Sequence, residues 1–181
     1  MPRLYLLRHA KSSWDEPGLD DRSRPLTARG RKAARLAARY IEMQAIAPDL
    51  VLCSPAQRCQ ETLEPLRAAF AGPVRIDVEE ELYGAGSGDL LRRLRKVPPE
   101  TRSVMVIGHN PAIHELAVML ARGTDDLVRL RDKYPTAALA TLSFTGDWKD
   151  LGETAAVLEE FVVPREPEPP REPSPETPRE P

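Results

Sequence analysis

Several features that would assign this chain of 181 residues to a specialised class are absent or scarce. It has only two cysteines, Cys53 and Cys59, which are too few for a disulfide framework. No apolar run approaches the roughly 20 residues that cross a bilayer, and no signal-peptide pattern follows Met1. The formal net charge is only −2, from 26 basic and 28 acidic residues. We therefore expect a soluble, cytoplasmic, monomeric protein with neither nucleic acid nor a membrane as a partner.

One domain and a short tail account for the length of the chain. Residues 164–181 contain 8 prolines, 5 glutamates and 3 arginines. Such a segment has no apolar side chains to bury, which predicts a disordered, partly polyproline II tail. The remaining residues, 1–163, hold 23 basic and 23 acidic side chains, so that their formal charge is zero apart from histidine. We predict that they form a single globular domain.

Short β-rich runs alternate with helical patterns along this domain. The predicted strands are 3–8, 50–53, 74–78, 103–107, 139–144 and 155–162. Thr27 can cap a first helix that ends before Pro48, and further helices are predicted at 57–70, 88–96 and 112–121. Alternating strands and helices predict an α/β fold, a three-layer α/β/α sandwich with a mostly parallel central sheet. Ligands of such sheets bind beyond the carboxyl ends of the strands.

Arginine and histidine side chains follow three of the predicted strands. Arg8 and His9 come at the end of the first strand. Arg58 follows the second, and His109 follows the strand at 103–107. A guanidinium presents paired N–H donors that match phosphate oxygens, and two of them over one site balance a phosphate dianion. The strand ends therefore predict a phosphoryl-binding pocket.

The two histidines suit different roles in this pocket. Neutral imidazole is a competent nucleophile toward phosphorus near pH 7 when one ring nitrogen is held as an N–H donor. His9 fits that role. His109, protonated or donating a hydrogen bond, would stabilise charge on the equatorial oxygens during in-line transfer. These residues predict a metal-independent phosphatase that passes through a covalent phosphohistidine intermediate.

Four segments carry a resemblance to a known family. They are LLRHA from Leu6, RPLTARG from Arg24, SPAQRCQET from Ser54 and GHNP from Gly108. In this order they resemble the histidine phosphatase superfamily, whose fold is phosphoglycerate mutase-like, and most closely its small SixA-type phosphohistidine phosphatases. The resemblance spans residues 3 to about 163 and implies that 1–163 is a catalytic domain. It implies that His9 is phosphorylated, that Arg8 and Arg58 bind the phosphoryl group, and that His109 completes the pocket.

The resemblance also bears on the substrate and on the remaining site residues. It implies phosphohistidine on a protein as the substrate, with a sugar phosphate or another small phosphomonoester as the alternative, and no cofactor. Many superfamily members protonate the leaving group with a carboxylic acid, expected here within Glu79–Glu81. Counting back from Gly84 favours Glu80, whereas the Glu-Leu pattern of the short branch favours Glu81, and some short members lack an effective acid. We take Glu81 as the candidate acid.

Further substrate contacts are predicted close to these motifs. The candidates are Lys11, Arg24 and Asn110.

Three other functions fit the sequence less well. A cysteine phosphatase needs five residues between its cysteine and arginine, but only four separate Cys53 from Arg58. A zinc site would need all three histidines, yet His109 and His114 would lie about 140° apart around one helix. A binding module without catalysis would be expected to have lost His9 or an arginine. We therefore predict an enzyme without a metal site.

The composition of the tail generates a first testable prediction. Truncation after Val163 should change the free energy of unfolding by no more than about 0.5 kcal/mol, because the tail has no apolar side chains to pack. Thermal unfolding of the full and truncated chains measures the difference. A clear drop in melting temperature on truncation would mean that the tail docks on the domain.

Overall fold

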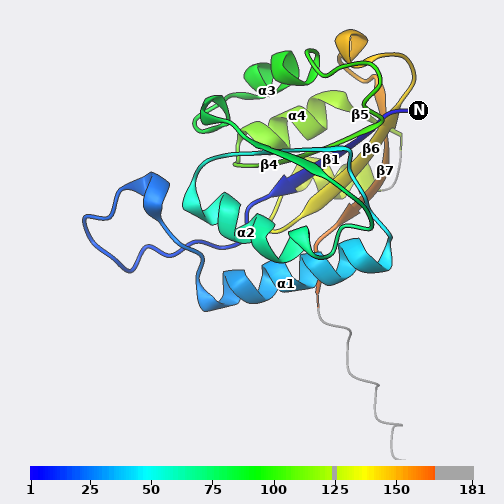
Figure 1. Cartoon of the computed structure of the whole chain (residues 1–181). Coiled ribbons are helices and arrows are strands. Elements are labelled where there is room, and N and C mark those ends of the chain that lie inside the picture. Colours follow the sequence, from blue (N-terminus) through cyan, green and yellow to red (C-terminus); the bar gives the residue numbers. More distant parts are fainter. Residues whose placement is uncertain (124–125, 166–181) are drawn as a thin grey trace, which may run out of the picture.

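A seven-stranded sheet forms the middle layer of the protein (Figure 1). The computed structural model describes residues 1–123 and 126–165. The strands are β1 (Arg3–Arg8), β2 (Leu50–Cys53), β3 (Arg75–Val78), β4 (Ser103–Gly108), β5 (Ala121–Arg122), β6 (Leu139–Phe144) and β7 (Ala156–Val162). Their order across the sheet is β3-β2-β4-β1-β6-β7-β5. Among these strands, β6 alone runs against the others, because it pairs antiparallel with both β1 and β7 while the other pairs are parallel.

Helices cover both faces of this sheet. They are α1 (Ala28–Met43), α2 (Gln57–Arg67), α3 (Ser87–Leu94), α4 (Ala112–Leu120) and α5 (Asp126–Asp132), with 3₁₀ turns η1 (Asp21–Ser23), η2 (Glu80–Leu82) and η3 (Trp148–Asp150). The helices α1 and α2 pack on one face, and α3 and α4 on the other (Figure 1). The expected three-layer sandwich is confirmed.

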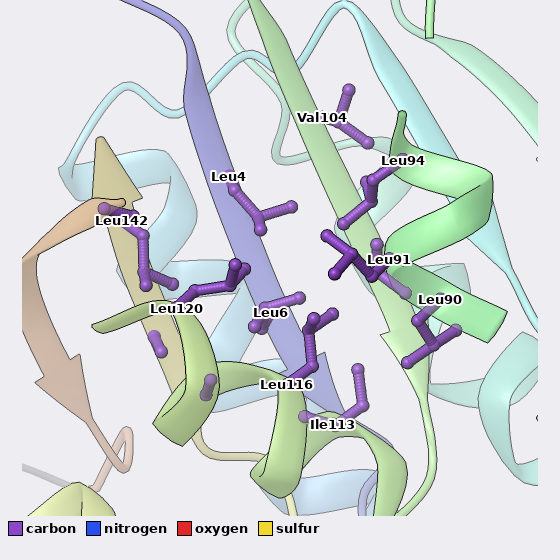
Figure 2. Close-up of a cluster of buried hydrophobic side chains, with 14 of the residues drawn as sticks. Leu4, Leu6, Leu90, Leu91, Leu94, Val104, Ile113, Leu116, Leu120 and Leu142 are labelled. Atoms are coloured by element: carbon purple, nitrogen blue, oxygen red, sulfur yellow. The ribbon is translucent and has the colours of Figure 1, made fainter. Parts of the chain in front are cut away.

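The side-chain alternation of β1 divides the core into two layers. Leu4 and Leu6 are fully buried on the face covered by α3 and α4, where they lie near Leu116 and Leu120 (Figure 2). Tyr5 and Leu7 belong to the cluster on the opposite face, together with side chains of α1 and α2. Successive side chains of a strand point to opposite faces, so a continuous apolar run such as residues 4–7 is typical of a strand buried on both sides.

The sequence-based elements agree with the structure except at their ends and in the C-terminal third of the domain. The second predicted helix ends at Arg67 instead of residue 70, and the third covers Ser87–Leu94 instead of 88–96. The helix α5 and the two-residue strand β5 were not predicted, because such short elements carry too little periodicity to be recognised. The predicted tail conformation concerns residues that lie, apart from Pro164 and Arg165, outside the described part of the chain. Within that part, no helix is long and apolar enough to span a membrane.

The start of α1 is tied to the loop after β1. The Thr27 hydroxyl oxygen accepts a hydrogen bond from the Gly30 N–H at 2.9 Å, which confirms the predicted cap. The Thr27 N–H donates to the Lys11 carbonyl oxygen at 2.9 Å. A Cβ atom on Gly30 would lie 2.1 Å from that same carbonyl oxygen. Glycine at position 30 therefore lets the helix approach the loop closely, and the helix start holds Lys11 in place.

This close approach predicts an unusual response to a helix-favouring substitution. Gly30→Ala should lower the free energy of unfolding by about 1–3 kcal/mol, because the clash with backbone outweighs the roughly 1 kcal/mol gained in helix propensity. Gly88→Ala is the matched control, since its Cβ would meet only the flexible end of Arg92 at 3.7 Å. That control should be neutral or stabilising by up to about 1 kcal/mol in urea unfolding. Equal stabilisation by both substitutions would contradict the analysis.

Candidate active site

The carboxyl ends of β2, β4 and β1 lie side by side in the sheet and bring together the loops that follow them. The His9 N–H donates to the Gly108 carbonyl oxygen and the Ser54 N–H to the Ile107 carbonyl oxygen, each at 3.0 Å. These loops border a cavity of about 570 Å³. The predicted site residues that line it are Arg8, His9, Lys11, Arg24, Arg58, His109 and Asn110.

His9 is a buried imidazole with a defined proton position. Its Nδ1 lies 2.7 Å from the carbonyl oxygen of Ala10. Because a carbonyl oxygen only accepts hydrogen bonds, Nδ1 carries the proton and Nε2 keeps its lone pair in the neutral ring. Burial lowers the pKa of His9 to about 3, and the hydrogen bond to Ala10 opposes this shift without cancelling it. The ring is therefore neutral at physiological pH.

His109 lies beside His9, with 5.2 Å between the ring centroids. Its Nε2 lies 2.7 Å from the Ser54 hydroxyl oxygen and 3.5 Å from the Cys59 sulfur. Both neighbours can donate a proton, so a neutral ring that accepts at Nε2 carries its own proton on Nδ1. Burial, and after it the positive charge of Arg58, lowers the pKa of His109 to about 4.

Arg8 and Asn110 are anchored on one backbone carbonyl. Arg8 donates from Nη1 to the Tyr134 carbonyl oxygen at 2.8 Å, and Asn110 donates from Nδ2 to the same oxygen at 3.0 Å. Burial lowers the pKa of Arg8. Its Nε and the Asn110 Oδ1 are buried without a hydrogen-bond partner. Buried polar atoms of this kind are uncommon in folded proteins, and here they belong to side chains that line the cavity.

Arg58 is held along one edge by a single residue, Asp21 of η1. Its Nη1 donates to the Asp21 carbonyl oxygen at 2.6 Å, and its Nη2 donates to the Asp21 carboxylate at 3.1 Å. The same carboxylate accepts from the Tyr83 hydroxyl at 2.8 Å. Hydrogen bonding, to Arg24 first and Tyr83 next, lowers the pKa of Asp21 to about 2. Asp21 is thus a charged side chain in the cavity wall near neutral pH.

Arg24 lines the cavity, but much of its donor capacity is already used. Its guanidinium donates to the Ser12 hydroxyl at 2.6 Å, the Ser13 carbonyl oxygen at 2.8 Å and the Asp21 carboxylate at 2.8 Å. The Trp14 ring stacks on it, with 3.2 Å between the guanidinium carbon and the ring centroid. Arg24 therefore organises the loop after β1 to a greater extent than the sequence suggested.

Neither of the two candidate acids lines the cavity that contains the histidines. Glu81 lines a neighbouring cavity, together with Arg92 and Lys96, and this cavity shares Ala85 with the first. Glu80 is exposed and pairs with Arg22 at 2.6 Å. Of the carboxylates in the described chain, the cavity with His9 is lined by Asp21 alone. The structure therefore does not bring Glu81 together with the other predicted site residues.

Four further residues at the site were not among the predicted site residues. They are Asp21, Ser54, Thr62 and Tyr83. Ser54 and Thr62 lie within the motif from Ser54, where their hydroxyl groups are a usable signal. Asp21 lies in a charged run, and nothing in that run separates it from an ordinary solvated loop.

The third histidine lies elsewhere in the fold. His114 Nε2 is 2.7 Å from the Leu130 carbonyl oxygen, so this ring links α4 to α5. In residues 1–123 and 126–165, no group of three or more histidine, cysteine, aspartate or glutamate side chains is arranged to hold a metal ion.

The sequence of this chain is similar to those of several known proteins. Residues 4–91 match the histidine phosphatase superfamily (branch 1). An uncharacterised protein of Mycobacterium tuberculosis (strain H37Rv) is 37% identical over 163 residues, which cover 88% of this chain and 100% of that protein. The phosphohistidine phosphatase SixA of Escherichia coli (strain K12) is 31% identical over 123 residues, which cover 67% of this chain and 75% of SixA.

Solved structures agree with these sequence matches. A protein of Agrobacterium tumefaciens assigned as a SixA phosphohistidine phosphatase is 35% identical and superposes with a TM-score of 0.75, covering 91% of this chain and 99% of the other. A protein histidine phosphatase SixA complexed with tungstate is 25% identical, with a TM-score of 0.73 and coverage of 90% and 97%. This chain therefore belongs to the histidine phosphatase superfamily, in its small SixA-type branch, and is a phosphatase.

The burial of the two rings predicts the pH dependence of their protonation. In the unfolded chain both should titrate near 6.5, whereas their folded pKa values are about 3 and about 4. Below about pH 6.5 the unfolded chain therefore binds more protons than the folded chain. The free energy of unfolding should then fall as the pH drops below about 6.5. In ¹⁵N NMR, His9 and His109 should stay neutral in the folded protein down to about pH 5. Titration of either ring near 6.5 would contradict the analysis.

Proposed function

We propose that this phosphatase transfers the phosphoryl group of its substrate to Nε2 of His9 and then hydrolyses the phosphohistidine formed there. The observation that carries this proposal is the hydrogen bond from Nδ1 of His9 to the Ala10 carbonyl oxygen at 2.7 Å. It leaves the lone pair on Nε2, and the lowered pKa keeps the ring neutral, so the nucleophile needs no general base.

We assign the charge stabilisation to three neighbours of His9. Arg8 and Arg58 line the same cavity and would bind the equatorial oxygens of the phosphoryl group. His109, whose ring centroid is 5.2 Å from that of His9, would donate from Nδ1. These groups supply positive charge and directed N–H donors where negative charge concentrates during transfer. The chemistry proposed here has no step that needs a metal ion or a cofactor.

The reaction has two in-line steps. In the first, the lone pair of His9 Nε2 forms a bond to phosphorus, and the electron pair of the breaking bond passes to the leaving group. In the second, water attacks the phosphorus of phospho-His9, the electron pair of that P–N bond returns to Nε2, and phosphate leaves. The ring is then ready for another cycle.

We propose phosphohistidine on a protein as the substrate. Glu80 and Glu81 lie outside the cavity, and the carboxylate inside it, Asp21, has a pKa of about 2. None of them is suited to protonate an alkoxide near neutral pH. A phosphorylated imidazole needs far less help, because imidazole is a better leaving group than an alkoxide. The named activity of the SixA relative of Escherichia coli is consistent with this substrate.

We further propose that residues 1–163 form the catalytic domain and that Lys11 and Asn110 contribute additional substrate contacts. Both side chains line the cavity. We propose that Arg24 positions Ser12 and Asp21, to which it donates hydrogen bonds. This role is in addition to any direct contact of Arg24 with the substrate.

A comparison of substrates in EDTA tests this function. The purified protein should hydrolyse a phosphohistidine-containing protein much faster than alkyl and sugar phosphates, and His9→Ala should abolish turnover while the circular dichroism spectrum stays unchanged. Glu80→Gln and Glu81→Gln should each keep the phosphohistidine activity within about tenfold of wild type, below the 10²- to 10⁴-fold that a general acid supplies.

Two results would contradict the proposal. Near-normal activity of His9→Ala would exclude His9 as the nucleophile. A strong sugar-phosphatase activity that falls at least about 100-fold in Glu80→Gln or Glu81→Gln would identify a general acid and replace the proposed substrate by a small phosphomonoester.

A further inference from the structure

Asp21 is the one negatively charged side chain among the described residues that line the cavity, against the cations Arg8, Lys11, Arg24 and Arg58. Its Oδ1 accepts from Arg24, and its Oδ2 accepts from Arg58 and Tyr83. A carboxylate has about four lone-pair sites, so three bonds leave room for another donor. The negative charge of Asp21 opposes the binding of a negatively charged phosphoryl group. Its presence in this cavity, with capacity for another donor, therefore needs a functional explanation.

Trp14 lines the same cavity as Asp21, and both residues contact the guanidinium of Arg24. One face of its ring is stacked on the Arg24 guanidinium, yet the residue is 77% exposed. The other face of the indole is therefore open to solvent. The electron-rich face of an indole attracts cations and stacks on planar rings. Arg24 thus positions an aromatic face, that of Trp14, and a negative charge, that of Asp21, in the wall of one cavity.

The exposure of these residues shows where they lie relative to the reaction. His9 and Arg58 are only 8% and 7% exposed, whereas the Asp21 side chain is 46% exposed. The phosphoryl group would therefore sit at the floor of the cavity, and Asp21 and Trp14 lie toward its mouth. In an in-line transfer the leaving group lies opposite the nucleophile, so with His9 at the floor it faces the mouth.

We propose that Asp21 and Trp14 form a leaving-group subsite that selects substrates whose leaving group is a protonated nitrogen ring, an N-phosphoryl imidazolium. This inference rests on the proposed phosphohistidine activity and adds to it the residues that recognise the ring. Trp14 stacks on the planar ring, and Asp21 attracts its positive charge and accepts its free N–H. Anionic leaving groups, such as a phosphorylated carboxylic acid or a second phosphate, are repelled by the same carboxylate.

The subsite explains how the leaving group departs without a general acid. In N-phosphoryl imidazolium, one ring nitrogen is bonded to phosphorus and the other carries a proton. When His9 Nε2 attacks, the electron pair of the breaking P–N bond passes to the ring and neutralises its charge, so the ring leaves as neutral imidazole. No proton needs to be delivered during this step. Asp21 favours the protonated substrate, and it remains ionised near neutral pH because its pKa is about 2.

A purely structural role for Asp21 predicts a different result. Asp21 also holds Arg58 through its carbonyl oxygen and its carboxylate. Arg58 would contact the transferred phosphoryl group, which every substrate shares. Loss of that support should therefore lower all activities in the same proportion, whereas loss of a leaving-group subsite should change their ratio.

The experiment measures kcat/KM of the full chain on a phosphohistidine peptide and on p-nitrophenyl phosphate, whose leaving group departs as an anion. In Asp21→Asn, the ratio of the two values should fall at least about fivefold, on the scale of one lost charge-assisted interaction at a partly exposed site. Trp14→Ala should also lower the ratio, and Trp14→Phe, which keeps an aromatic face, should restore most of it. Asp20→Asn is the matched control, because it removes the same charge from the neighbouring position, which does not line the cavity, and its ratio should stay within about twofold.

Equal loss of both activities in Asp21→Asn would overturn the subsite and leave Asp21 as a positioning residue for Arg58. An Asp20→Asn ratio that falls as far as that of Asp21→Asn would also overturn it, because the effect would then be general electrostatics. Failure of the proposed function itself gives a separate result: the wild-type protein would not hydrolyse the phosphohistidine peptide at all.

Discussion

The hydrogen bond from Nδ1 of His9 to the carbonyl oxygen of Ala10 decides which nitrogen of the proposed nucleophile is free to react. The residue that provides this carbonyl is itself held in place. The Ala10 N–H donates to the Thr62 hydroxyl oxygen at 3.0 Å, and the Thr62 hydroxyl donates to the Arg58 carbonyl oxygen at 2.6 Å. The helix that carries Arg58 therefore also orients the loop that carries His9. The proposed nucleophile and the proposed phosphoryl ligand are positioned by one continuous network.

Burial makes this network effective at neutral pH. Two imidazoles lie beside two guanidinium groups at the end of the sheet, and their low exposure lowers the pKa of both rings. A neutral, desolvated imidazole is a stronger nucleophile than one that is half protonated. The arginines stay charged at any physiological pH, so the cavity keeps positive charge for the proposed phosphoryl group while the His9 ring stays uncharged. Asp21 offsets part of that positive charge and accepts hydrogen bonds from both terminal nitrogens of Arg58.

Much of the fold could be predicted because its central strands are buried on both faces. The structure contains the elements that were predicted from the apolar runs at residues 4–7 and 104–107 and from the cap at Thr27. The antiparallel direction of β6 could not be predicted, because the hydrophobic pattern of a strand is the same in either direction. The short elements α5 and β5 depend on tertiary packing and carry little local signal.

The site could be predicted to the extent that its residues follow strand ends. Arg8, His9 and His109 directly end or follow strands, and topology alone brings them together. Glu81 was chosen from its place in a motif, but η2 directs this segment toward another cavity. Asp21 reaches the cavity through the loop between β1 and α1, whose path is set by hydrogen bonds from Arg24 and not by periodicity. Such hydrogen bonds within a loop have no signature in a single sequence.

The most direct test of the central claim is to trap the phosphorylated enzyme by rapid acid-free quench during turnover and to locate the phosphate by ³¹P and ¹⁵N NMR. The account predicts one acid-labile phosphoryl group bonded to Nε2 of His9, with Nδ1 still protonated. Phosphate on another side chain, on Nδ1 of His9, or no phosphoenzyme at any point of the time course would contradict it.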